Sequence, residues 1–338
     1  MKPDPGTLPL PGEHPFAPFV RILGRGKTGS RSLSRDEASA GFGMILRGEV
    51  EPLQLGAFLM LLRVKEETGA ELAGFVDACR AAMTAPPAGL QADLDWSSYA
   101  GKKHQHPWYL LTLLLLAEAG FRVLVHGSAG HTPGRLYTEQ AMRELGLPVA
   151  SSWHEVHSQL DSAGLSYLPL REFCESLHDL LQLKPLLGLR SPVNTLTRML
   201  NPLAAPCSLQ SIFHPAYAAL HQEADQLLGQ PAAMVLKGES GEIEIKPSAD
   251  TRLQWLREGH SSPLVFPRVL AQRPEPVPCP AVAPLRRLWR GEVDDSYGLA
   301  AARGTAATAL LLLGAADSIE TAAGLADELW RNRDRDRL

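Results

Sequence analysis

The sequence predicts a two-domain protein, in which a small all-α N-terminal domain precedes a larger α/β domain with a mostly parallel central sheet. Three observations predict this fold class. Between Phe16 and Met83, apolar residues recur at helical spacing. Residues 85–89 (APPAG) then have the composition of a hinge. Beyond this hinge, short apolar runs that suit buried strands alternate with helical patterns, as expected for a parallel sheet covered by helices.

Three helices are expected in the N-terminal domain. Ser34 and Glu37 have the spacing of a capping box, so the first helix should begin after Ser34 and end at Gly48. The second helix opens at Pro52, and the third begins near Ala70. The second helix carries an apolar stripe made of Leu55, Phe58, Leu59 and Leu62. Because so small a domain cannot bury every apolar face internally, we expect a homodimer interface within residues 16–83.

The α/β domain offers three strand patterns. Residues 122–126 (RVLVH) and 232–237 (AAMVLK) are nearly all apolar, which favours buried parallel strands, and residues 242–245 (EIEI) predict a short third strand. Helices are expected over residues 108–119, 138–145, 297–313 and 318–332, and the last two should cover a face of the sheet. A flexible, proline-rich arm is expected over residues 1–15, and a frayed, charge-alternating tail over 333–338.

Composition excludes several classes of protein. The formal net charge of −4 excludes a uniformly basic chain but not a local basic patch, and 45% hydrophobic residues exclude disorder of the whole chain. The four cysteines form no C-x-x-C pair, which fits free thiols in a reducing cytoplasm. The N-terminus lacks an apolar signal core, and the runs at 110–117 and 304–316 are shorter than the roughly 20 residues of a membrane span. We therefore expect a cytoplasmic protein without a membrane partner.

Three segments together resemble the anthranilate phosphoribosyltransferase family, also called glycosyltransferase family 3. They are LSRDEASAGFGMILRGEVEPLQLGAFLMLLRVKEETGAELAGF, GFRVLVHGSAG followed by EQAMRELGLP, and KPLLGLRSPVNTLTRMLNPL. The resemblance extends from about Leu23 to the C-terminus. It implies a nucleoside phosphorylase/phosphoribosyltransferase-like fold, with a helical dimerisation domain over 16–85 that a segment around 175–200 joins in space. Residues 90–174 and 201–332 would then form the α/β domain.

One branch of this family is a closer match. The segments ILGRGKTGSRSLSRDEA, SYAGKKHQHPWYLLTLLLLAEAGF and KGESGEIEI resemble the YbiB-like group. This resemblance implies the transferase fold together with binding of nucleic acid that depends little on sequence.

The residues that would hold phosphoribosyl pyrophosphate are changed. The family's loop, GTGGDG, lets backbone N–H groups approach phosphate oxygens, whereas residues 97–102 are SSYAGK, in which Tyr99 would obstruct that approach. The family's Asp-Glu pair for Mg²⁺ is replaced by Ile243-Glu244. Glu242 cannot substitute for the missing aspartate, because neighbours on a strand point to opposite faces and Glu242 would point away from the face of Ile243. We therefore expect no bound cofactor and no phosphoribosyl transfer from phosphoribosyl pyrophosphate to anthranilate.

Basic side chains stand near the altered loop and near the N-terminus. The residues expected to contact phosphate are Arg21, Arg25, Lys27, Arg31, Lys102, Lys103, Arg135, Lys184 and Arg190. By resemblance, Arg190 matches the arginine of the family's Leu-Gly-x-Arg motif, and Lys184 falls where the family has another substrate-binding arginine. Lys102 and Lys103 are expected on the surface, and Glu242 and Glu244 are expected to be exposed carboxylates.

The leading hypothesis is a non-enzymatic homodimer that binds DNA or RNA through its phosphates, with no catalytic residue and no metal. The net charge then requires the basic residues to be segregated on one face. The alternative is a phosphoribosyl- or pentosyltransferase with an altered substrate, in which Lys102, Lys103 and Arg190 bind a phosphorylated compound. Mg²⁺ and phosphoribosyl pyrophosphate would be needed only under this alternative. A third hypothesis is a small-molecule sensor that uses the cleft between the domains.

Overall fold

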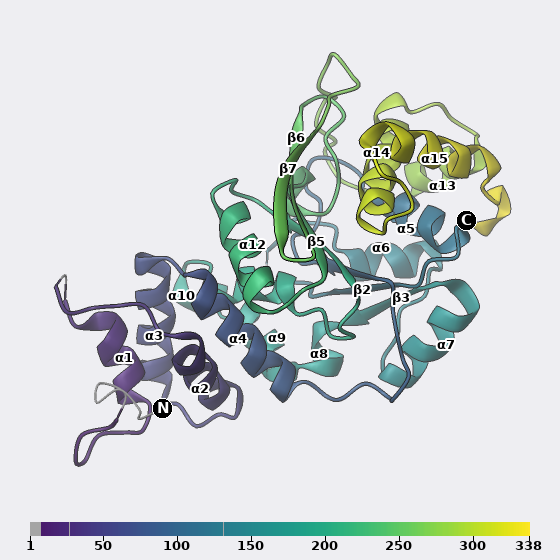
Figure 1. Ribbon diagram of the computed structural model, residues 1–338. Coiled ribbons are helices and arrows are strands. Elements are labelled where there is room, and N and C mark those ends of the chain that lie inside the picture. The colour runs from purple at the N-terminus through teal and green to yellow at the C-terminus, as the bar shows by residue number, and fades with distance from the viewer. Residues whose placement is uncertain (1–7, 27, 131) are drawn as a thin grey trace.

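The computed structural model describes residues 8–26, 28–130 and 132–338 and confirms the predicted fold class (Figure 1). The N-terminal part is helical, with α1 (Ala17–Gly24), α2 (Arg35–Leu46), α3 (Pro52–Lys65) and α4 (Gly69–Ala82). The capping box of Ser34 and Glu37 is present, which confirms the predicted start of α2. A second capping box joins Thr68 and Glu71 at the start of α4. Residues 1–7, which make up half of the expected arm, lie outside the described residues.

Helices α2 and α4 approach each other closely because Gly74 has no side chain. A Cβ atom at this position would lie 2.2 Å from the carbonyl oxygen of Arg35. Phe16 and Phe75 both contact Phe58 of α3 with their rings. The helical domain therefore has an aromatic core of its own.

The apolar stripe of α3 lies largely inside this domain. Phe58, Leu59 and Leu62 are completely buried, so the argument that used them for a dimer interface is wrong. Two other apolar residues of the same helix are exposed instead, Leu53 at 88% and Val64 at 84%. The homodimer itself stays a prediction.

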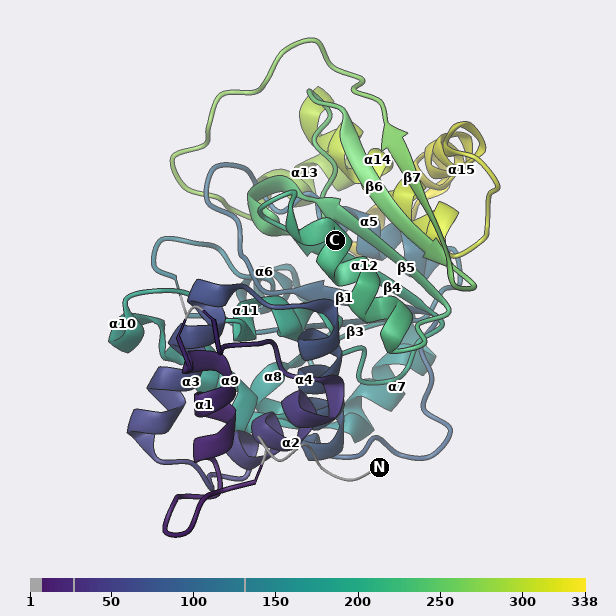
Figure 2. The same ribbon diagram turned by 60° about the vertical axis from the view of Figure 1, so that its left-hand side comes forward.

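A seven-stranded sheet forms the centre of the larger domain. Its strands are β1 (Leu94–Ser98), β2 (Val123–Gly127), β3 (Leu165–Pro169), β4 (Cys207–Ile212), β5 (Ala232–Lys237), β6 (Thr251–Arg257) and β7 (His260–Phe266). Their order is β3-β2-β1-β4-β5-β6-β7. The first five are parallel, while β6 and β7 form an antiparallel hairpin that extends the sheet beyond β5 (Figure 2).

Alternate residues of the strands contribute to two separate hydrophobic cores. Val123 and Val125 of β2 face one core, whereas Leu124 faces the other. The first core contains α5 (Tyr109–Glu118), α6 (Thr138–Leu145), α13 (Ala283–Arg290), α14 (Ser296–Leu312) and α15 (Ile319–Asn332). The second contains residues of the helical domain, α7 (Trp153–Ala163), α8 (Leu170–Phe173), α9 (Glu175–Gln182), α11 (Val193–Leu196) and α12 (Tyr217–Leu227). The short helix α10 (Lys184–Leu187) lies between α9 and α11. The helical domain and the segment around 175–200 thus share one core.

Two predicted segments differ from the structure. Residues 242–245 form no strand but a loop that follows the 3-10 turn Glu239–Gly241. The C-terminal tail, which was expected to fray, packs against α13 and α15, since the Arg333 guanidinium lies 3.9 Å from the centre of the Trp330 ring and Leu338 is buried. Among the described residues, no helix is long and apolar enough to cross a bilayer.

Candidate functional site

The carboxyl ends of the parallel strands meet at one edge of the sheet, which is where open α/β sheets place their ligands. The loop that follows β1 is occupied there by two glutamates of the loop that follows β5. Glu242 accepts hydrogen bonds from the backbone N–H groups of Ala100 (2.7 Å) and Gly101, and from the Ser98 hydroxyl (2.7 Å). The loop's inward-facing N–H groups are therefore already satisfied by a carboxylate of the protein.

The second glutamate holds Lys102. The Lys102 ammonium lies 2.5 Å from a carboxylate oxygen of Glu244, and the other oxygen accepts the backbone N–H of Tyr109 at the start of α5. Both members of this ion pair are completely buried. The expected surface position of Lys102 is therefore wrong, and so is the expected exposure of Glu242 and Glu244. Lys103, the next residue, is exposed as expected.

Arg135 also holds this loop in place with hydrogen bonds. Its guanidinium donates to the carbonyl oxygens of Ala100 and Gly101, each at 2.9 Å, and to that of Ser240 at 3.2 Å. This side chain, which was expected to contact phosphate, joins the loop after β1 to the turn after β5.

These residues do not fit the magnesium ion that the family resemblance implies. The Glu242 carboxylate already accepts three hydrogen bonds, and the Lys102 ammonium occupies the place of a cation beside Glu244. Burial raises the pKa of Glu244 to about 7, which further disfavours an ionised metal ligand. In the part of the chain that the structure describes, no three His, Cys, Asp or Glu side chains form a metal-binding group.

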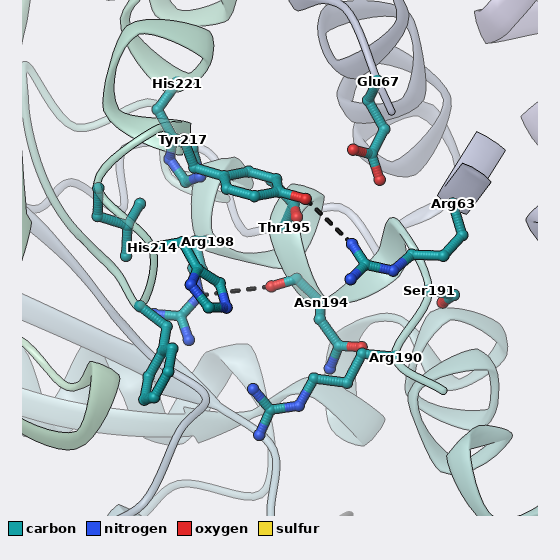
Figure 3. A pocket seen from close by; sticks show the side chains of 12 residues that line it. Arg63, Glu67, Arg190, Ser191, Asn194, Thr195, Arg198, His214, Tyr217 and His221 are labelled. Carbon is teal, nitrogen blue, oxygen red and sulfur yellow. Dashed lines mark hydrogen bonds between the residues drawn. The ribbon is translucent and has the colours of Figure 1, made fainter. Parts of the chain in front are cut away.

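A cleft of about 110 Å³ lies at the next position along the edge, between the helical domain and the carboxyl end of β4 (Figure 3). It is lined by Arg63, Glu67, Arg190, Ser191, Asn194, Thr195, Arg198, Ile212, Phe213, His214, Tyr217 and His221. Three of these residues carry guanidinium groups. Arg63 is at the end of α3, Arg190 follows α10, and Arg198 lies in the 3-10 turn Thr197–Met199. Segments that are distant in the sequence therefore bring positive charge to one cleft.

The three guanidinium groups differ in their partners. Arg198 is buried and donates to the backbone and hydroxyl oxygens of Ser211, both at 2.7 Å, and burial lowers its pKa to about 10. Arg63 donates to the Tyr217 hydroxyl at 3.1 Å. Arg190 is half-buried, which lowers its pKa, and it makes no hydrogen bond or ion pair with a described residue. Of the three, Arg190 is thus the guanidinium without a hydrogen-bond partner among the described residues, while Arg63 uses one of its donors.

Glu67 faces the same cleft from the connection between α3 and α4 (Figure 3). Its side chain is only 7% exposed, and its Oε2 atom has no hydrogen-bond partner in the described structure. Burial raises the pKa of this carboxyl group. A ligand with an anionic group toward Arg190 and a hydrogen-bond donor toward Glu67 would satisfy both side chains.

A chain of buried polar side chains joins the end of β1 to β2. The Tyr99 hydroxyl lies 2.7 Å from Nδ1 of His126, whose Nε2 lies 3.1 Å from Asp95 on β1. Tyr99 is completely internal, and so is Trp108. Neither ring is therefore available to stack on a base.

A second group of buried polar side chains joins Gln210 of β4 to Asp225 and the cleft residue His221 of α12. Gln210 donates to Asp225 at 2.9 Å, and its amide oxygen lies 2.8 Å from Nδ1 of His221. Burial raises the pKa of Asp225 to about 7 and lowers the pKa of His221 to about 3. Both groups are therefore stabilised in their neutral forms.

The other predicted phosphate contacts are scattered. Arg21 pairs with Glu13 and Arg31 with Glu37, each at 2.6 Å, and Lys184 donates to the Thr132 hydroxyl at 3.3 Å. Arg25 is exposed, and Lys27 lies outside the described residues. Of the eight predicted residues that the structure describes, only Arg190 lines the cleft.

Sequence reasoning missed several residues of the cleft, namely Arg63, Glu67, Arg198, Tyr217 and His221. Arg198 stands within the segment KPLLGLRSPVNTLTRMLNPL that carries the family resemblance, and this position could have drawn attention to it. Arg63 and Glu67 likewise stand within the first quoted segment, LSRDEASAGFGMILRGEVEPLQLGAFLMLLRVKEETGAELAGF, whereas Tyr217 and His221 stand in none of the quoted segments. Only the folded chain brings them together.

The fold and the position of the cleft define a protein of the phosphoribosyltransferase-like α/β class. The chain belongs to glycosyltransferase family 3, the family of the anthranilate phosphoribosyltransferases. Residues 18–83 match the helical bundle domain of the glycosyl transferase family.

Two relatives show the extent of the likeness. The chain is 30% identical over 249 residues to the uncharacterized protein YbiB of Escherichia coli, covering 72% of this chain and 77% of YbiB. It is 28% identical over 236 residues to the anthranilate phosphoribosyltransferase of Thiobacillus denitrificans, covering 69% and 68%.

Solved structures agree in fold. The anthranilate phosphoribosyltransferase of Thermus thermophilus superposes with a TM-score of 0.77 at 22% identity, covering 92% of this chain and 94% of that one. The enzyme of Saccharomyces cerevisiae in complex with PRPP and Mg superposes with a TM-score of 0.76 at 14% identity, covering 94% and 93%.

Proposed function

We propose that this protein is a phosphoribosyl- or pentosyltransferase with an altered substrate, and that its cleft binds a phosphorylated small molecule. The observation that supports this proposal most directly is that Arg63, Arg190 and Arg198 line one cleft beside the sheet edge. Guanidinium groups bind phosphate with paired, charge-assisted hydrogen bonds. The names of the relatives, which include anthranilate phosphoribosyltransferases, support transfer of a pentosyl group.

Charge placement supports the same chemistry. Departure of an anion from a pentosyl carbon is favoured by fixed positive charge near the leaving group. Arg190 would supply that charge, while Glu67 would accept a hydrogen bond from the second substrate. Because Lys102 and Glu242 close the neighbouring loop, the phosphorylated substrate differs from phosphoribosyl pyrophosphate held by Mg²⁺.

Calorimetric titration of phosphorylated pentoses tests the proposal. The ligands are ribose 1-phosphate, ribose 5-phosphate and phosphoribosyl pyrophosphate with Mg²⁺, each against the wild type and Arg190→Gln. A lost charge-assisted hydrogen bond of about 1.5–3 kcal/mol lowers affinity by roughly 10- to 100-fold. The matched control is Arg25→Gln, which removes an exposed arginine outside the cleft and should change nothing.

Turnover is then measured in the presence of an aromatic amine or a nucleobase, as release of phosphate from ribose 1-phosphate or of diphosphate from phosphoribosyl pyrophosphate; ribose 5-phosphate, which has no leaving group at its anomeric carbon, is tested for binding alone. No binding of any phosphorylated pentose by the wild type, or equal binding by Arg190→Gln, would contradict the cleft as the site. Turnover that survives in Arg190→Gln would contradict the role of its charge.

Binding of DNA or RNA without sequence preference is the second candidate function. The exposure of Arg25 and Lys103 favours it, because both side chains could reach a phosphate backbone. The pairing of Arg21 and Arg31 with glutamates and the burial of Lys102 reduce the charge on which this candidate depends. A homodimer would present each basic residue twice and increase avidity.

A salt titration separates the two candidates. Binding to random oligonucleotides should weaken with salt at a log–log slope of roughly −0.9 per phosphate contact on duplexes and about −0.7 on single strands. The double variant Arg25→Glu/Lys103→Glu should weaken all sequences alike, whereas Arg190→Gln should not. Absence of binding at low salt rules this candidate out.

A further inference from the structure

The loop that follows β1 has the form of an anion site that the protein itself fills. Two consecutive backbone N–H groups, those of Ala100 and Gly101, point at one carboxylate oxygen of Glu242, and the Ser98 hydroxyl donates to the other. Successive N–H groups that converge in this way form a cradle for negative charge. All four residues are buried, so water does not compete for these donors.

The loop that delivers Glu242 has the backbone needed for this contact. A Cβ atom on Gly238 would lie 1.5 Å from the carbonyl oxygen of Glu242, so only glycine lets the chain pass there. Gly241 has a φ of +88°, and Ser240 has a φ of +59°, a left-handed conformation that is uncommon for a residue with a side chain. This backbone brings the Glu242 carboxylate to the cradle.

Side chains on both sides hold the loop in place. Arg135 joins Ser240 to the cradle loop, and Arg198 donates to the carbonyl oxygen of Gly241 at 2.9 Å. Two residues after Glu242, the Glu244 carboxylate binds Lys102. Four charged side chains, Arg135, Arg198, Lys102 and Glu244, therefore hold the contact in place besides its own hydrogen bonds.

We propose that Glu242 is a built-in carboxylate ligand of the cradle formed by Ser98, Ala100 and Gly101. The wild-type loop 97–102 therefore takes no external phosphate or diphosphate. Without the carboxylate, the cradle becomes a binding site for a small external anion such as acetate. This inference concerns the end of β1 and does not depend on the function proposed for the cleft.

Chemical rescue of Glu242→Ala tests the proposal, because acetate replaces the atoms that the substitution removes. The Tm of this variant should rise by roughly 3–6 °C over a hundredfold range of sodium acetate, compared with sodium chloride at equal ionic strength. Wild type should not respond, and neither should Glu242→Gln, whose side chain still fills the cradle. The matched control is Glu239→Ala, which removes a nearby buried carboxylate that pairs with Lys246 at 3.5 Å and accepts no hydrogen bond from the cradle.

An equal response of Glu242→Ala and Glu239→Ala to acetate overturns the proposal. If Glu242→Ala folds in acetate but not in chloride, the rescue is shown directly. If it folds in neither, calorimetric titration of the wild type with pyrophosphate decides. The proposal is overturned if pyrophosphate binds the wild type and Ser98→Ala weakens that binding. It is supported if the wild type binds no pyrophosphate at this loop. The response of the Tm to acetate should be the same when Arg190→Gln is added to each variant. Pyrophosphate binding that Arg190→Gln removes and Ser98→Ala leaves unchanged belongs to the cleft, so a failure in the cleft is distinguishable from a failure here.

Discussion

Two neighbouring regions on the same edge of the sheet carry charged side chains that differ in whether the protein supplies their partners. At the loop after β1, Lys102 and Glu244 neutralise each other at 2.5 Å with no contact with water. In the cleft, the Arg190 guanidinium and Oε2 of Glu67 have no hydrogen-bond partner among the described residues. A charged side chain can serve a ligand only where the protein has not already neutralised it. The comparison therefore assigns ligand binding to the cleft and closure to the loop.

The largest expected effect comes from breaking the buried pair. Lys102→Met leaves the Glu244 carboxylate without its counter-charge, and loss of one partner of a buried ion pair costs about 3–5 kcal/mol of stability. Because burial raises the pKa of Glu244 to about 7, the variant should recover part of this loss at pH 5, where the carboxyl group takes up a proton. Urea unfolding at pH 5 and pH 8 measures both effects.

The double variant Lys102→Met/Glu244→Met is the control for this experiment. It removes both charges and should be more stable than Lys102→Met alone at pH 8. A loss below about 1 kcal/mol in Lys102→Met would show that the pair is less buried than the structure has it.

The next largest effect is a pH dependence of stability that comes from the buried carboxyl group of Asp225. The pKa of Asp225 is raised from 3.8 to about 7 in the folded protein, so the folded state binds its proton more tightly than the unfolded state. This contribution to stability is fully present below pH 3.8 and is lost as the pH rises to about 7, by at most about 4 kcal/mol.

Asp225→Asn should abolish that loss, so the variant gains stability relative to the wild type between pH 4 and pH 8. Urea unfolding across this range gives the difference, with Asp294→Asn as the exposed control. A constant difference between the two proteins would contradict the raised pKa.

A substitution of Arg190 in the cleft should affect the stability of the protein far less than Lys102→Met in the loop does. Arg190→Gln removes a half-buried guanidinium without a partner among the described residues, so the free energy of unfolding should change by less than about 0.5 kcal/mol. Urea unfolding beside Lys102→Met provides the comparison. A loss that approaches that of Lys102→Met would mean that Arg190 is structural.

The smallest effect on folding is expected at the exposed apolar residues of α3. We propose that Leu53 and Val64 contribute to a homodimer interface, because large apolar side chains that are more than four-fifths exposed favour burial against a second chain. Leu53→Glu/Val64→Glu should give a monomer by light scattering with an unchanged circular dichroism spectrum. A dimer that persists in this variant would exclude this face.

Local sequence patterns were sufficient for the fold class, for α2–α6, α14 and α15 and for β2 and β5, but not for the other helices or for β1, β3 and β4. The capping pair Ser34 and Glu37, the helical pattern over 138–145 and the apolar run 232–237 each predicted an observed boundary, because caps, turns and burial act over a few residues. The hairpin of β6 and β7 was not predicted. Its apolar residues are interrupted by exposed ones, so the pattern is weak.

The run 242–245 shows why periodicity alone can mislead. Its two isoleucines are buried in the core and its two glutamates bind the cradle loop and Lys102, so the residues alternate between two surroundings as a strand would. Alternation reports that the two sides of a segment differ, but it does not report whether a neighbouring strand forms hydrogen bonds with it.

The sequence by itself determined the two-domain architecture, the family and the loss of the glycine-rich loop, since each rests on contiguous residues. Only the tertiary structure decided what the charged residues do. Lys102 and Glu244 are separated by 142 positions, and the cleft combines Arg63 of the helical domain with Arg190 and Tyr217. Whether a charge is paired or available depends on which distant side chain the fold places within a few ångströms, and spacing along the chain carries no information about that distance.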